Sequence, residues 1–563
     1  MDRLIECVPN ISEGRRDDVI QAIAAVVETV EGVKLLDVDP GRSTNRTVIT
    51  FVGPPETVGE AAFRLIKKAS ELIDMSKHRG EHPRMGATDV CPFVPVRGVS
   101  MDDCIEVAHA LGQRVGAELG IPGYFYENAA KATDRKNLAV CRKGQYEGLA
   151  KLTTVEGAPD FGPPVWNESV KKSGATAIGA RDFLIAYNVN LNTTSARRAN
   201  AIAFDIRESG RVRREGGPGS PVMKDAQGEP MREPGSLKAV KGIGWYIEEY
   251  GIAQLSLNLT DIQVTPVHIA FDEACLRSQA RGIRVTGSEL VGLLPLRVLT
   301  DAADFYLTKQ ERSLGISDAE KVKIAVKSLG LDDLAPFNPE ERVIEYIIAD
   351  KGLTPLLEMD LKAFALETAS ESPAPGGGSI AAYAGVLGTS LATMVANLSA
   401  HKRGWDDRWK EFSDIAVRGM ALQGQLLALV DADTAAFNGI MDAYGLPKSS
   451  EAQKSTRTQA IQDATRHAID VPMEVARISM LSMEVAEKMA EFGNPNSITD
   501  AGVGAMAIRV GVMGAILNAR VNVIDLTDAA YVAKTLETCN AMWKEVHVRE
   551  AAVLARVDAV LNA

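Results

Sequence analysis

Paired cysteines are missing from this sequence. Its six cysteines, at positions 7, 91, 104, 141, 275 and 539, form no Cys-x-x-Cys motif, which removes the usual zinc and dithiol signatures. We therefore expect reduced, buried thiols and a cytoplasmic location. The first ten residues, MDRLIECVPN, also lack an apolar run behind a basic start, so we expect no secretory signal there.

An excess of positive charge is missing as well. The sequence has 62 Lys and Arg against 74 Asp and Glu, a formal charge of −12 at pH 7. Such a chain is not built to neutralise nucleic-acid phosphates across a broad face, although a local basic pocket is compatible with it. The charge balance therefore predicts a small-molecule partner and no nucleic acid.

Long uncharged stretches are rare, and one of them has about the length that a bilayer requires: IAAYAGVLGTSLATMVANL, residues 380–398. Its Gly, Ser, Thr and Asn content, and the charged HKRGWDDRWKE that soon follows, indicate a helix buried by other helices. We therefore expect this stretch to belong to a core and predict no membrane span.

The length of 563 residues exceeds what one hydrophobic core supports, so we expect several domains. Residues 1–180 and 181–329 alternate short β-rich runs with amphipathic runs, with a hairpin inserted in the first range. This predicts two α+β subdomains, each a sheet–helix sandwich, rather than a strictly parallel doubly wound sheet. Long Ala-, Met- and Leu-rich helical periods predict an all-α domain over 359–563. Residues 330–358 are the predicted linker, and the Gly-, Pro- and charge-rich segment 209–236 is a predicted loop or insertion.

Two of the seven histidines lie four residues apart in SKHRGEHPRMGATDV. On a helix, His78 and His82 would share a face, and Glu81 beside them would suggest a metal site. The glycines and the proline disfavour a helix, which leaves a metal site, a structural polar loop and a catalytic loop as interpretations. We favour the catalytic loop and predict no metal. Arg79 and Arg84 would disfavour a charged histidine, which could then act as a general base near neutral pH.

Several motifs resemble a known family in order and spacing. The segments ECVPNISEGR, LLDVDPGRSTNRTVITFVG, MSKHRGEHPRMGATDVCPFVPVRGVS, APDFGP and GIGWYIEEYGIAQLSLNLTD resemble the formiminotransferase domain of the formimidoyltransferase-cyclodeaminases. The segments SPAPGGGSIAAYAG, LVDADTAAFNGIMDAYGLPK and GNPNSITDAGVGAMA resemble the cyclodeaminase domain. Together these matches span almost the whole chain.

The resemblance implies a bifunctional folate enzyme of histidine degradation. One domain would transfer the formimino group of N-formiminoglutamate to N5 of tetrahydrofolate and release glutamate. The other would cyclise 5-formiminotetrahydrofolate to 5,10-methenyltetrahydrofolate and release ammonia. The resemblance also implies polyglutamylated tetrahydrofolate as co-substrate and a homo-oligomer built as a ring of dimers. Small-residue helices such as AGVGAMAIRVGVMGAILNAR would permit the close helix packing of such an assembly.

By resemblance, His82 is the catalytic histidine of the transferase. One imidazole can take the proton that N5 loses and return a proton to the departing glutamate nitrogen. Asp39 is a candidate for orienting His82 or the attacking amine, and equally a turn carboxylate that caps PGRS. Four arginines either pair with carboxylates of formiminoglutamate or folate or are solvated surface residues: Arg42, Arg46, Arg79 and Arg84.

The segment 161–180, FGPPVWNESVKKSGATAIGA, aligns with the family's folate-contacting loop. Its tryptophan could stack on a pterin or benzoyl ring, and the alternative is an ordinary linker between subdomains. The candidate folate-contacting residues of this segment are Gly162, Pro163, Pro164, Val165, Trp166 and Gly174.

In the helical domain, Asp431 and Asp433 are two residues apart, so on a helix they point about 200° apart and cannot form a dyad. We expect one of them to be buried and functional and the other to be solvated. The resemblance selects Asp433 as the acid/base of the cyclodeaminase, which would move a proton from N10 to the leaving ammonia. Burial would raise its pKa. A surface helix carboxylate is the alternative.

Two polar breaks complete the candidate folate-binding residues. PGGGS, residues 375–379, is either a flexible helix start or a turn whose backbone N–H groups bind an anionic folate, and the resemblance favours the second. NPNSITDAG, residues 494–502, lies between helices, and its serine and aspartate also suit a helix N-cap. The candidates in these breaks are Gly376, Gly377, Gly378, Ser379, Ser497 and Asp500.

Three functions are compatible with these features. The first is the bifunctional enzyme. The second is a formimino- or formyltransferase whose helical domain is inactive or acts on another folate derivative. The third is a folate-binding or assembly scaffold in which the helical domain holds subunits together. We favour the first because His82 and Asp433 both stand inside matching motifs.

Overall fold

The computed structural model describes residues 3–42, 44–80, 82–217, 219–349 and 355–563. The chain divides into two compact units: Met1–Val298 with Leu329–Ala349, and Leu299–Ser328 with Asp350–Ala563. The first holds two large sheets layered with helices and a small two-stranded sheet, and the second holds only helices, which confirms the predicted fold class. The predicted subdomain and linker boundaries stay predictions. Part of that linker, residues 350–354, and Glu81 lie outside the described residues.

The first unit contains a seven-stranded mixed sheet. β1 and β2 form one broken strand between β4 and β5, and β3 pairs with β4 as the predicted hairpin. β7 pairs in parallel with both β5 and β6. The strands are β1 Leu4–Cys7, β2 Asn10–Ile11, β3 Lys34–Gly41, β4 Arg46–Gly53, β5 Thr88–Arg97, β6 Gly123–Glu127 and β7 Thr176–Ala180.

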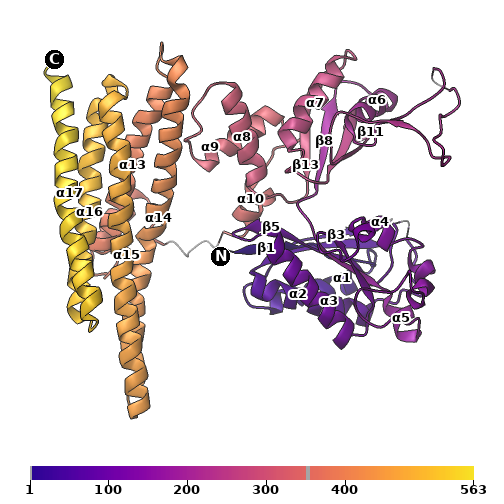
Figure 1. Ribbon diagram of the computed structural model, residues 1–563, viewed down its shortest axis with the longest axis horizontal. Helices are drawn as coiled ribbons and strands as arrows, with labels where there is room; N and C mark the ends of the chain where they lie inside the picture. Colours follow the sequence, from indigo (N-terminus) through magenta and orange to yellow (C-terminus); the bar gives the residue numbers. More distant parts are fainter. Residues whose placement is uncertain (1–2, 43, 81, 218, 350–354) are drawn as a thin grey trace. The chain divides into compact units, whose positions relative to one another are not determined.

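Helices cover both faces of this sheet, to different extents. α1 (Asp17–Ala24), α2 (Pro55–Leu72) and α3 (Met101–Glu118) pack on one face over the larger core (Figure 1). The alternation along β6 sends Phe125 into this core and Tyr124 and Tyr126 into a smaller one. The smaller core lies under the segment with η2 Thr133–Lys136, α4 Leu138–Cys141, η3 Tyr146–Thr153 and α5 Glu168–Ser173.

The interpretation of residues 161–180 as one loop is wrong for its last part. Residues Thr176–Ala180 form β7 between β5 and β6, and all five are buried. Its composition of Thr, Ala, Ile and Gly gives little β signal because the neighbouring strands and helix leave room only for small side chains. At Gly179, for example, an added Cβ would lie 2.6 Å from the Tyr126 ring.

The second sheet of the first unit has four antiparallel strands in the order β11-β12-β8-β13. α6 (Ala196–Ile206) and α7 (Val267–Gln279) pack against it. β11 was not predicted, since two glycines weaken its β signal; a Cβ at Gly244 would lie 2.1 Å from the Asn200 amide of α6. These strands are β8 Ile185–Leu191, β11 Val240–Ile247, β12 Ile252–Leu259 and β13 Val285–Val291.

Short elements complete the first unit. The predicted insertion 209–236 forms an arm around β9 (Arg211–Val212) and β10 (Arg232–Glu233), outside the sheet cores. α10 (Pro339–Arg342) and α11 (Ile344–Ile347) follow later in the chain, and the Lys34 ammonium donates to the Ile347 carbonyl at 2.8 Å.

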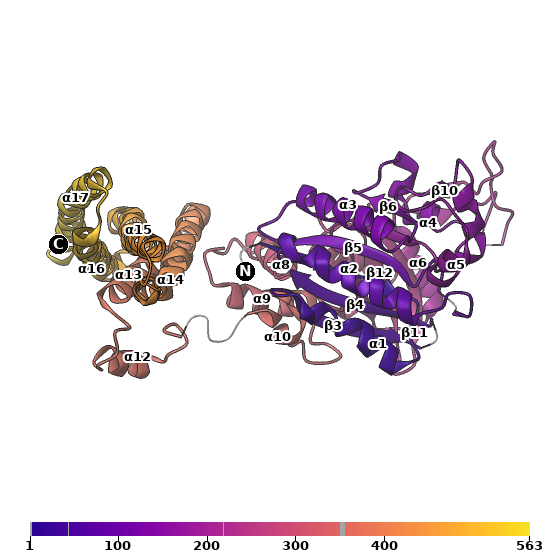
Figure 2. The ribbon, with the colours of Figure 1, turned by 90° about the horizontal axis from the view of Figure 1, so that it is seen from below.

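The second unit is a helical bundle. Long helices run side by side in Figures 1 and 2, coloured orange to yellow, around one continuous core. Small residues allow close approach of α13 and α16: a Cβ at Gly388 would lie 2.5 Å from the Gly504 carbonyl. The helices are α8 Arg297–Lys309, α9 Asp318–Leu329, α12 Leu361–Thr368, α13 Gly377–Ala400, α14 Trp409–Gly445, α15 Glu451–Phe492, α16 Ile498–Asn522 and α17 Ala529–Leu561, with η4 Asp406–Arg408, η5 Pro495–Ser497 and η6 Val523–Asp525 between them.

Two helical stretches, Gly377–Ala400 and Pro495–Asp525, are long and apolar enough to cross a membrane by composition alone. Their most apolar windows are 61% and 50% buried inside the bundle. Core helices of soluble proteins share this composition, so it does not establish a span. The stretch 380–398 lies in a helix that packs mostly inside the bundle, as its small and polar residues predicted.

Two candidate active sites

The predicted irregular loop between α2 and β5 is confirmed, and it holds its two histidines differently. His78 is buried; its Nε2–H donates to the Asn45 carbonyl at 2.9 Å and its Nδ1 accepts from the Arg84 Nε at 3.4 Å. Both ring nitrogens are therefore occupied within the protein. No group of three or more His, Cys, Asp or Glu side chains suited to a metal ion occurs among the described residues. The loop geometry thus gives His78 a structural role.

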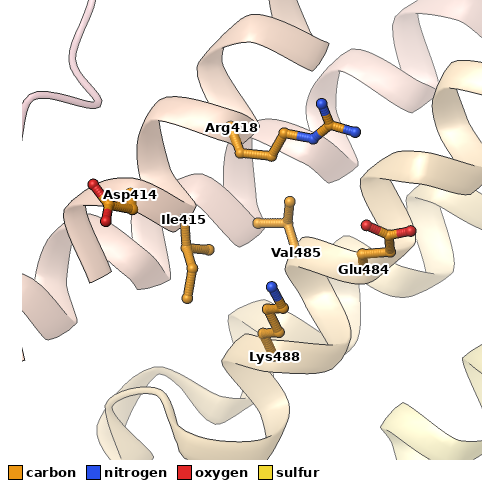
Figure 3. Close-up of a pocket in the computed structure, with 6 residues that line it drawn as sticks. All are labelled: Asp414, Ile415, Arg418, Glu484, Val485 and Lys488. Atoms are coloured by element: carbon orange, nitrogen blue, oxygen red, sulfur yellow. The ribbon is translucent and has the colours of Figure 1, made fainter. Parts of the chain in front are cut away.

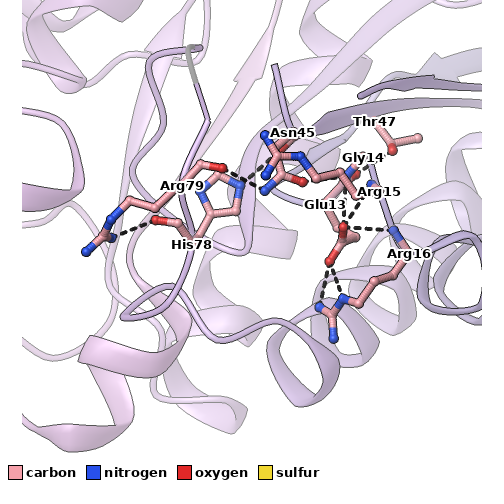
Figure 4. A network of polar contacts seen from close by, with 8 residues as sticks. All are labelled: Glu13, Gly14, Arg15, Arg16, Asn45, Thr47, His78 and Arg79. Atoms are coloured by element: carbon pink, nitrogen blue, oxygen red, sulfur yellow. Dashed lines mark hydrogen bonds and ion pairs between the residues drawn. The ribbon is translucent and has the colours of Figure 1, made fainter. Parts of the chain in front are cut away.

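A polar network fixes this loop to two neighbouring turns (Figure 4). Glu13 accepts from the amides of Gly14, Arg15 and Arg16 at 2.9–3.1 Å and from the Arg16 guanidinium at 2.6 Å. Asn45, with a left-handed φ of 50°, accepts from the Gly14 amide and donates to the Arg79 carbonyl. Burial would raise the pKa of Glu13, but these hydrogen bonds lower it.

His82 is half-buried, and among the described residues only one of its ring nitrogens has a hydrogen-bond partner. Its Nδ1 lies 2.7 Å from the Pro83 carbonyl; because a carbonyl only accepts, Nδ1 carries the proton and Nε2 keeps a lone pair. Burial lowers the pKa of His82, the nearby Arg46 and Arg142 lower it further, and the Pro83 hydrogen bond and Asp89 partly oppose them. The imidazole is therefore neutral at neutral pH and presents a basic nitrogen.

Three charged groups surround His82. Asp89 is buried, accepts from the Met85 amide at 3.0 Å and forms an ion pair with Arg142. Arg46 is largely buried. Among the described residues, its guanidinium has no ion-pair partner and its Nε–H has no acceptor. Asp89 thus neutralises Arg142, while Arg46 is the cation left to meet an anion.

The other predicted charged residues lie in different settings. Arg84 is buried and makes two hydrogen bonds with Glu147, at 2.7 and 2.9 Å, so its guanidinium is already paired. Arg79 and Arg42 are exposed; Arg42 lies 3.5 Å from Asp17, and Arg79 donates to the carbonyl of its own neighbour, His78. Asp39 is exposed on β3, opposite Val48. The His82 Nδ1 contacts the Pro83 carbonyl, and a role of Asp39 in orienting the attacking amine stays a prediction. Of the predicted cations, only Arg46 combines burial with an unmatched charge.

The predicted folate loop is tied to the histidine loop by backbone. The Ala87 amide donates to Ser173 and the Ala175 amide to Met85. Gly174 has a φ of 70°, and a Cβ there would lie 2.2 Å from the Met85 carbonyl. Gly162 has a φ of 75°, and a Cβ there would lie 2.4 Å from the Ile121 carbonyl. The two glycines therefore allow the loop to pass close to neighbouring backbone.

The remaining residues of that loop are more exposed. Pro163 and Val165 are half-buried and Pro164 is exposed. Trp166 packs edge-on against Tyr146 at 5.7 Å between ring centroids, at the border of the smaller core. This contact leaves the ring partly solvent-accessible, and its stacking on a pterin stays a prediction.

Asp433 lines a cavity of about 230 Å³ within the helical unit. Its Oδ2 accepts from the Ser379 hydroxyl at 3.3 Å. Burial raises the pKa of Asp433, and hydrogen bonds from the side chain and backbone of Ser379 partly oppose the rise. The cavity is lined by Pro373, Ala374, Gly376, Gly377, Asp433, Thr434, Phe437, Ile440, Ala468, Asn518, Val521 and Asn522.

The expectation that Asp431 is solvated is wrong. Asp431 is 9% exposed and accepts from the Leu356 amide at 3.0 Å and the Leu357 amide at 3.4 Å. It therefore anchors the segment before α12 to α14. The half-buried carboxylate of Asp433 instead faces a cavity, as the two residues' angular separation on the helix requires.

The PGGGS turn lines one side of that cavity through Gly376 and Gly377. Gly376 precedes α13, and Gly377 and Gly378 form its first turn. A Cβ at Gly378 would lie 2.1 Å from the Asp433 Oδ1. Glycine is therefore required for the carboxylate to approach the helix N-terminus.

Ser497 and Asp500 lie at the other end of α16 from this cavity. Ser497 precedes the helix without a side-chain capping bond, so the predicted N-cap is wrong. About 20 helical residues separate it from Asn518, roughly 30 Å at 1.5 Å per residue. Within one chain these two residues therefore do not join Asp433.

Sequence reasoning missed several residues of both sites. Asp89 belongs to the GATDV motif, and its position four residues after Met85 gave a local signal. Arg142 gave none, because it lies 53 residues from Asp89. Asn518 and Thr434 became candidates only through their position in the Asp433 cavity.

Two other hollows in the helical unit contain none of the predicted residues. One, of about 150 Å³ between α14 and α15, is lined by four charged and two aliphatic side chains (Figure 3). The other, of about 400 Å³, lies around His401 and Trp409 and is mostly polar.

Comparisons with known proteins cover nearly the whole chain. Family models match in order: the formiminotransferase domain, N-terminal subdomain, over residues 4–181; the formiminotransferase domain over 186–349; and formiminotransferase-cyclodeaminase over 360–541. Formimidoyltransferase-cyclodeaminase of Rattus norvegicus is 44% identical over 99% of both chains.

Two shorter relatives match parts of the chain. Glutamate formimidoyltransferase of Streptococcus pyogenes is 40% identical over 55% of this chain and 95% of its own. Methenyltetrahydrofolate cyclohydrolase of Methylorubrum extorquens is 33% identical over 34% of this chain and 93% of its own. With the full-length match in rat, these findings show that the chain belongs to the formimidoyltransferase-cyclodeaminase family.

Proposed function

We propose that this chain is a bifunctional folate enzyme that acts in histidine degradation. It transfers the formimino group of N-formiminoglutamate to N5 of tetrahydrofolate and then cyclises the product to 5,10-methenyltetrahydrofolate. The observation that carries this proposal is the 44% identity over 99% of the chain to a relative with both activities in its name. The two separate sites, each with a titratable group whose pKa is shifted by burial, support it.

In the transferase site, His82 acts as general base and then as general acid. N5 of tetrahydrofolate attacks the formimino carbon, and the free Nε2 of His82 accepts the N5 proton. The bond from carbon to the glutamate nitrogen then breaks, and His82 returns the proton to that nitrogen. Arg46 holds a substrate carboxylate, because its largely buried charge has no ion-pair partner in the part of the chain that the structure describes.

In the cyclodeaminase site, Asp433 also acts first as general base and then as general acid. N10 attacks the formimino carbon while the Asp433 carboxylate takes the N10 proton. The carbon–nitrogen bond to the former imino nitrogen breaks, and Asp433 gives that nitrogen the proton with which ammonia departs. The raised pKa brings the carboxyl closer to the pH at which it can both accept and donate.

The cavity around Asp433 suits a reduced pterin. Pro373, Phe437, Ile440 and Val521 offer apolar walls, and Asp433 stands among them with a few polar groups. The folate is tetrahydrofolate, in polyglutamylated form. The N-terminal amides of α13 carry the positive end of the helix dipole toward this anionic ligand.

A second candidate for the helical unit is hydrolysis of methenyltetrahydrofolate. The relative from Methylorubrum extorquens, named a cyclohydrolase, favours it. The two functions differ in one product, because only the cyclodeaminase releases ammonia. A chain that transfers the formimino group, releases no ammonia and opens methenyltetrahydrofolate would have this second function.

The decisive experiment pairs two variants. His82→Ala should lose formimino transfer by about 10²–10⁴-fold yet cyclise supplied 5-formiminotetrahydrofolate at the wild-type rate. Asp433→Asn should transfer normally and accumulate 5-formiminotetrahydrofolate. Absorbance of methenyltetrahydrofolate and released ammonia report the two steps. Loss of both activities in each folded variant would contradict two independent sites.

The proposal extends to the state of the protein in the cell. It is a cytoplasmic homo-oligomer, assembled as a ring of dimers, whose partners are its small-molecule substrates and neither nucleic acid nor membrane. Exposed apolar side chains on α13 and α16, among them Leu387, Val510 and Leu517, support association of subunits. Light scattering of the purified protein, which gives the subunit number, tests this part.

A further inference from the structure

Asn518 approaches the same turn of α13 as Asp433, but from a different helix. A Cβ on Gly377 would lie 3.2 Å from the Asn518 Nδ2 and 3.5 Å from its Oδ1, and a Cβ on Gly378 would lie 2.1 Å from the Asp433 Oδ1. Both side chains line the 230 Å³ cavity. α14 and α16 therefore bring a carboxylate and a carboxamide together at two successive glycines.

The orientation of the Asn518 amide is fixed by its own helix. Nδ2 donates to the Gly514 carbonyl at 2.8 Å, which distinguishes the amide nitrogen from the oxygen. Within the described part of the chain, no donor reaches its Oδ1. The half-buried side chain thus offers the cavity an acceptor with two free lone pairs.

The other polar groups of the cavity are engaged in different ways. Asn522, one turn further along α16, donates to the Ala468 carbonyl at 2.8 Å and joins α16 to α15. The Thr434 hydroxyl lies 3.3 Å from the Ser379 hydroxyl, which itself donates to Asp433. The Asn522 amide is fixed by its backbone contact as well, but Asn518 is the side chain that a Cβ on Gly377 would meet, next to Gly378 and Asp433.

From this geometry we infer that Asn518 selects a formimino over a formyl group at N5, an inference that rests on the proposed cyclodeaminase function. The formimino nitrogen carries N–H groups, and one of them donates to the Asn518 Oδ1 while Asp433 serves N10. A formyl group has an oxygen at this position, which cannot donate and would face the Oδ1 lone pairs. The buried acceptor would then lose its partner and be repelled.

The same contact assists departure of ammonia. The formimino group enters as a protonated amidine, so when N10 bonds to the carbon and the N10 proton moves to Asp433, the =NH2+ nitrogen becomes a neutral NH2 amine. Asp433 then gives its proton to that amine, the carbon–nitrogen bond breaks, and ammonia leaves. The Asn518 Oδ1 accepts an N–H bond throughout, so it orients the nitrogen lone pair toward Asp433 and neither gains nor loses a proton.

The test measures discrimination. We compare the KM of the cyclodeaminase for 5-formiminotetrahydrofolate with the inhibition constant of 5-formyltetrahydrofolate, which is assayed as a competitor. Asn518→Leu removes the acceptor at similar volume, so KM should rise about 10–100-fold and the inhibition constant should stay the same or fall.

A matched control is Asn438→Leu, the same change at an exposed position of α14 outside the cavity, which should change neither constant. Thermal melting and transferase activity show whether each variant folds. If Asn518→Leu does not fold, Asn518→Ala must show the same loss of discrimination. A ratio that is unchanged in folded Asn518→Leu or Asn518→Ala overturns the inference.

Failure of this inference can be told apart from failure of the proposed function. A wild-type protein that releases no ammonia, or an Asp433→Asn variant that cyclises normally, refutes the cyclodeaminase assignment. An active wild type, an inactive Asp433→Asn and an unchanged ratio in the Asn518 variants refute only the role of Asn518.

Discussion

The two sites hold their titratable groups by opposite means. His82 stands in an irregular loop that hydrogen bonds from distant turns keep in place, whereas Asp433 stands inside a 37-residue helix and is held by close packing against α13. Burial, helped by nearby cations, lowers the pKa of the histidine, and burial raises the pKa of the carboxyl. Both shifts disfavour the charged form. The pKa of the histidine therefore moves down and the pKa of the carboxyl moves up, so the two values approach each other.

The comparison also separates what each site tolerates. A loop held by several hydrogen bonds can lose one of them and keep its backbone conformation, because the others remain. A carboxylate packed against a glycine has no such reserve, since the neighbouring backbone of a helix cannot move aside. We therefore expect the helical site to be more sensitive to added volume and the loop site to be more sensitive to changes of charge.

The largest effect is expected from Gly378→Ala. The added Cβ would lie 2.1 Å from the Asp433 Oδ1, so the carboxylate must move by about 1 Å, and such displacements cost about 100-fold in rate. Ammonia release should fall accordingly while formimino transfer stays unchanged. Gly439→Ala on α14 is the matched control, because its Cβ meets nothing within 4 Å. Near-normal ammonia release by Gly378→Ala would remove the contrast between the two sites.

The next effect is expected from Arg46→Met in the transferase site. Loss of a charge-assisted hydrogen bond to a substrate carboxylate, worth about 1.5–3 kcal/mol, should raise the KM for N-formiminoglutamate about 10–100-fold. Steady-state kinetics of formimino transfer measure it. The exposed Arg79 gives the control: Arg79→Met should change this KM by less than about threefold. Equal effects of the two substitutions would show that burial of Arg46 does not matter for binding.

These contrasts were only partly visible in the sequence. Glycine and proline around His82 act locally on the backbone, so the irregular loop could be predicted. The pairing of Arg84 could not, because Glu147 lies 63 residues further along the chain. Asp431 was misjudged for the same reason: its partners, the Leu356 and Leu357 amides, come 75 and 74 residues earlier.

The fold shows the same division between local and long-range information. The helical periodicity of apolar residues predicted the long helices of the second unit, and the β-rich runs predicted the β3–β4 hairpin. β7 was not predicted because its small residues give a weak β signal. Neighbours distant in sequence leave no room for larger side chains, as the Tyr126 ring does at Gly179. Motif resemblance supplied Asp433, but only packing shows that Ser497 lies at the far end of α16 from it.

The pH dependence of the two activities gives a smaller, directional test. Transfer requires neutral His82, so its rate should fall with decreasing pH through a pKa below the ordinary value of about 6.5. Cyclisation requires ionised Asp433, so its rate should fall through a pKa above the ordinary value of about 3.9. In Arg46→Met, loss of a nearby cation should move the acid limb of transfer to higher pH. A shift of the cyclisation limb in the same variant would contradict separate electrostatic environments.

The smallest effect is expected from Glu13→Gln, which tests whether the loop site owes its shape to hydrogen bonds with a buried charge. The lowered pKa of Glu13 means that its carboxylate stabilises the folded state above the unfolded pKa of about 4.3, and that this stability is lost as pH falls through the lowered folded value. At pH 7 the variant should lose about 1–3 kcal/mol, measured as a lower urea midpoint for loss of transferase activity. The difference from wild type should begin to shrink as the pH falls below about 4.3, and should vanish below the lowered folded pKa, where Glu13 is protonated in both states. Glu168→Gln, at a side chain that is 88% exposed, should change the free energy of unfolding by less than about 0.5 kcal/mol. A Glu13→Gln variant as stable as this control at pH 7 would show that packing, as in the helical site, and not the carboxylate holds the loop.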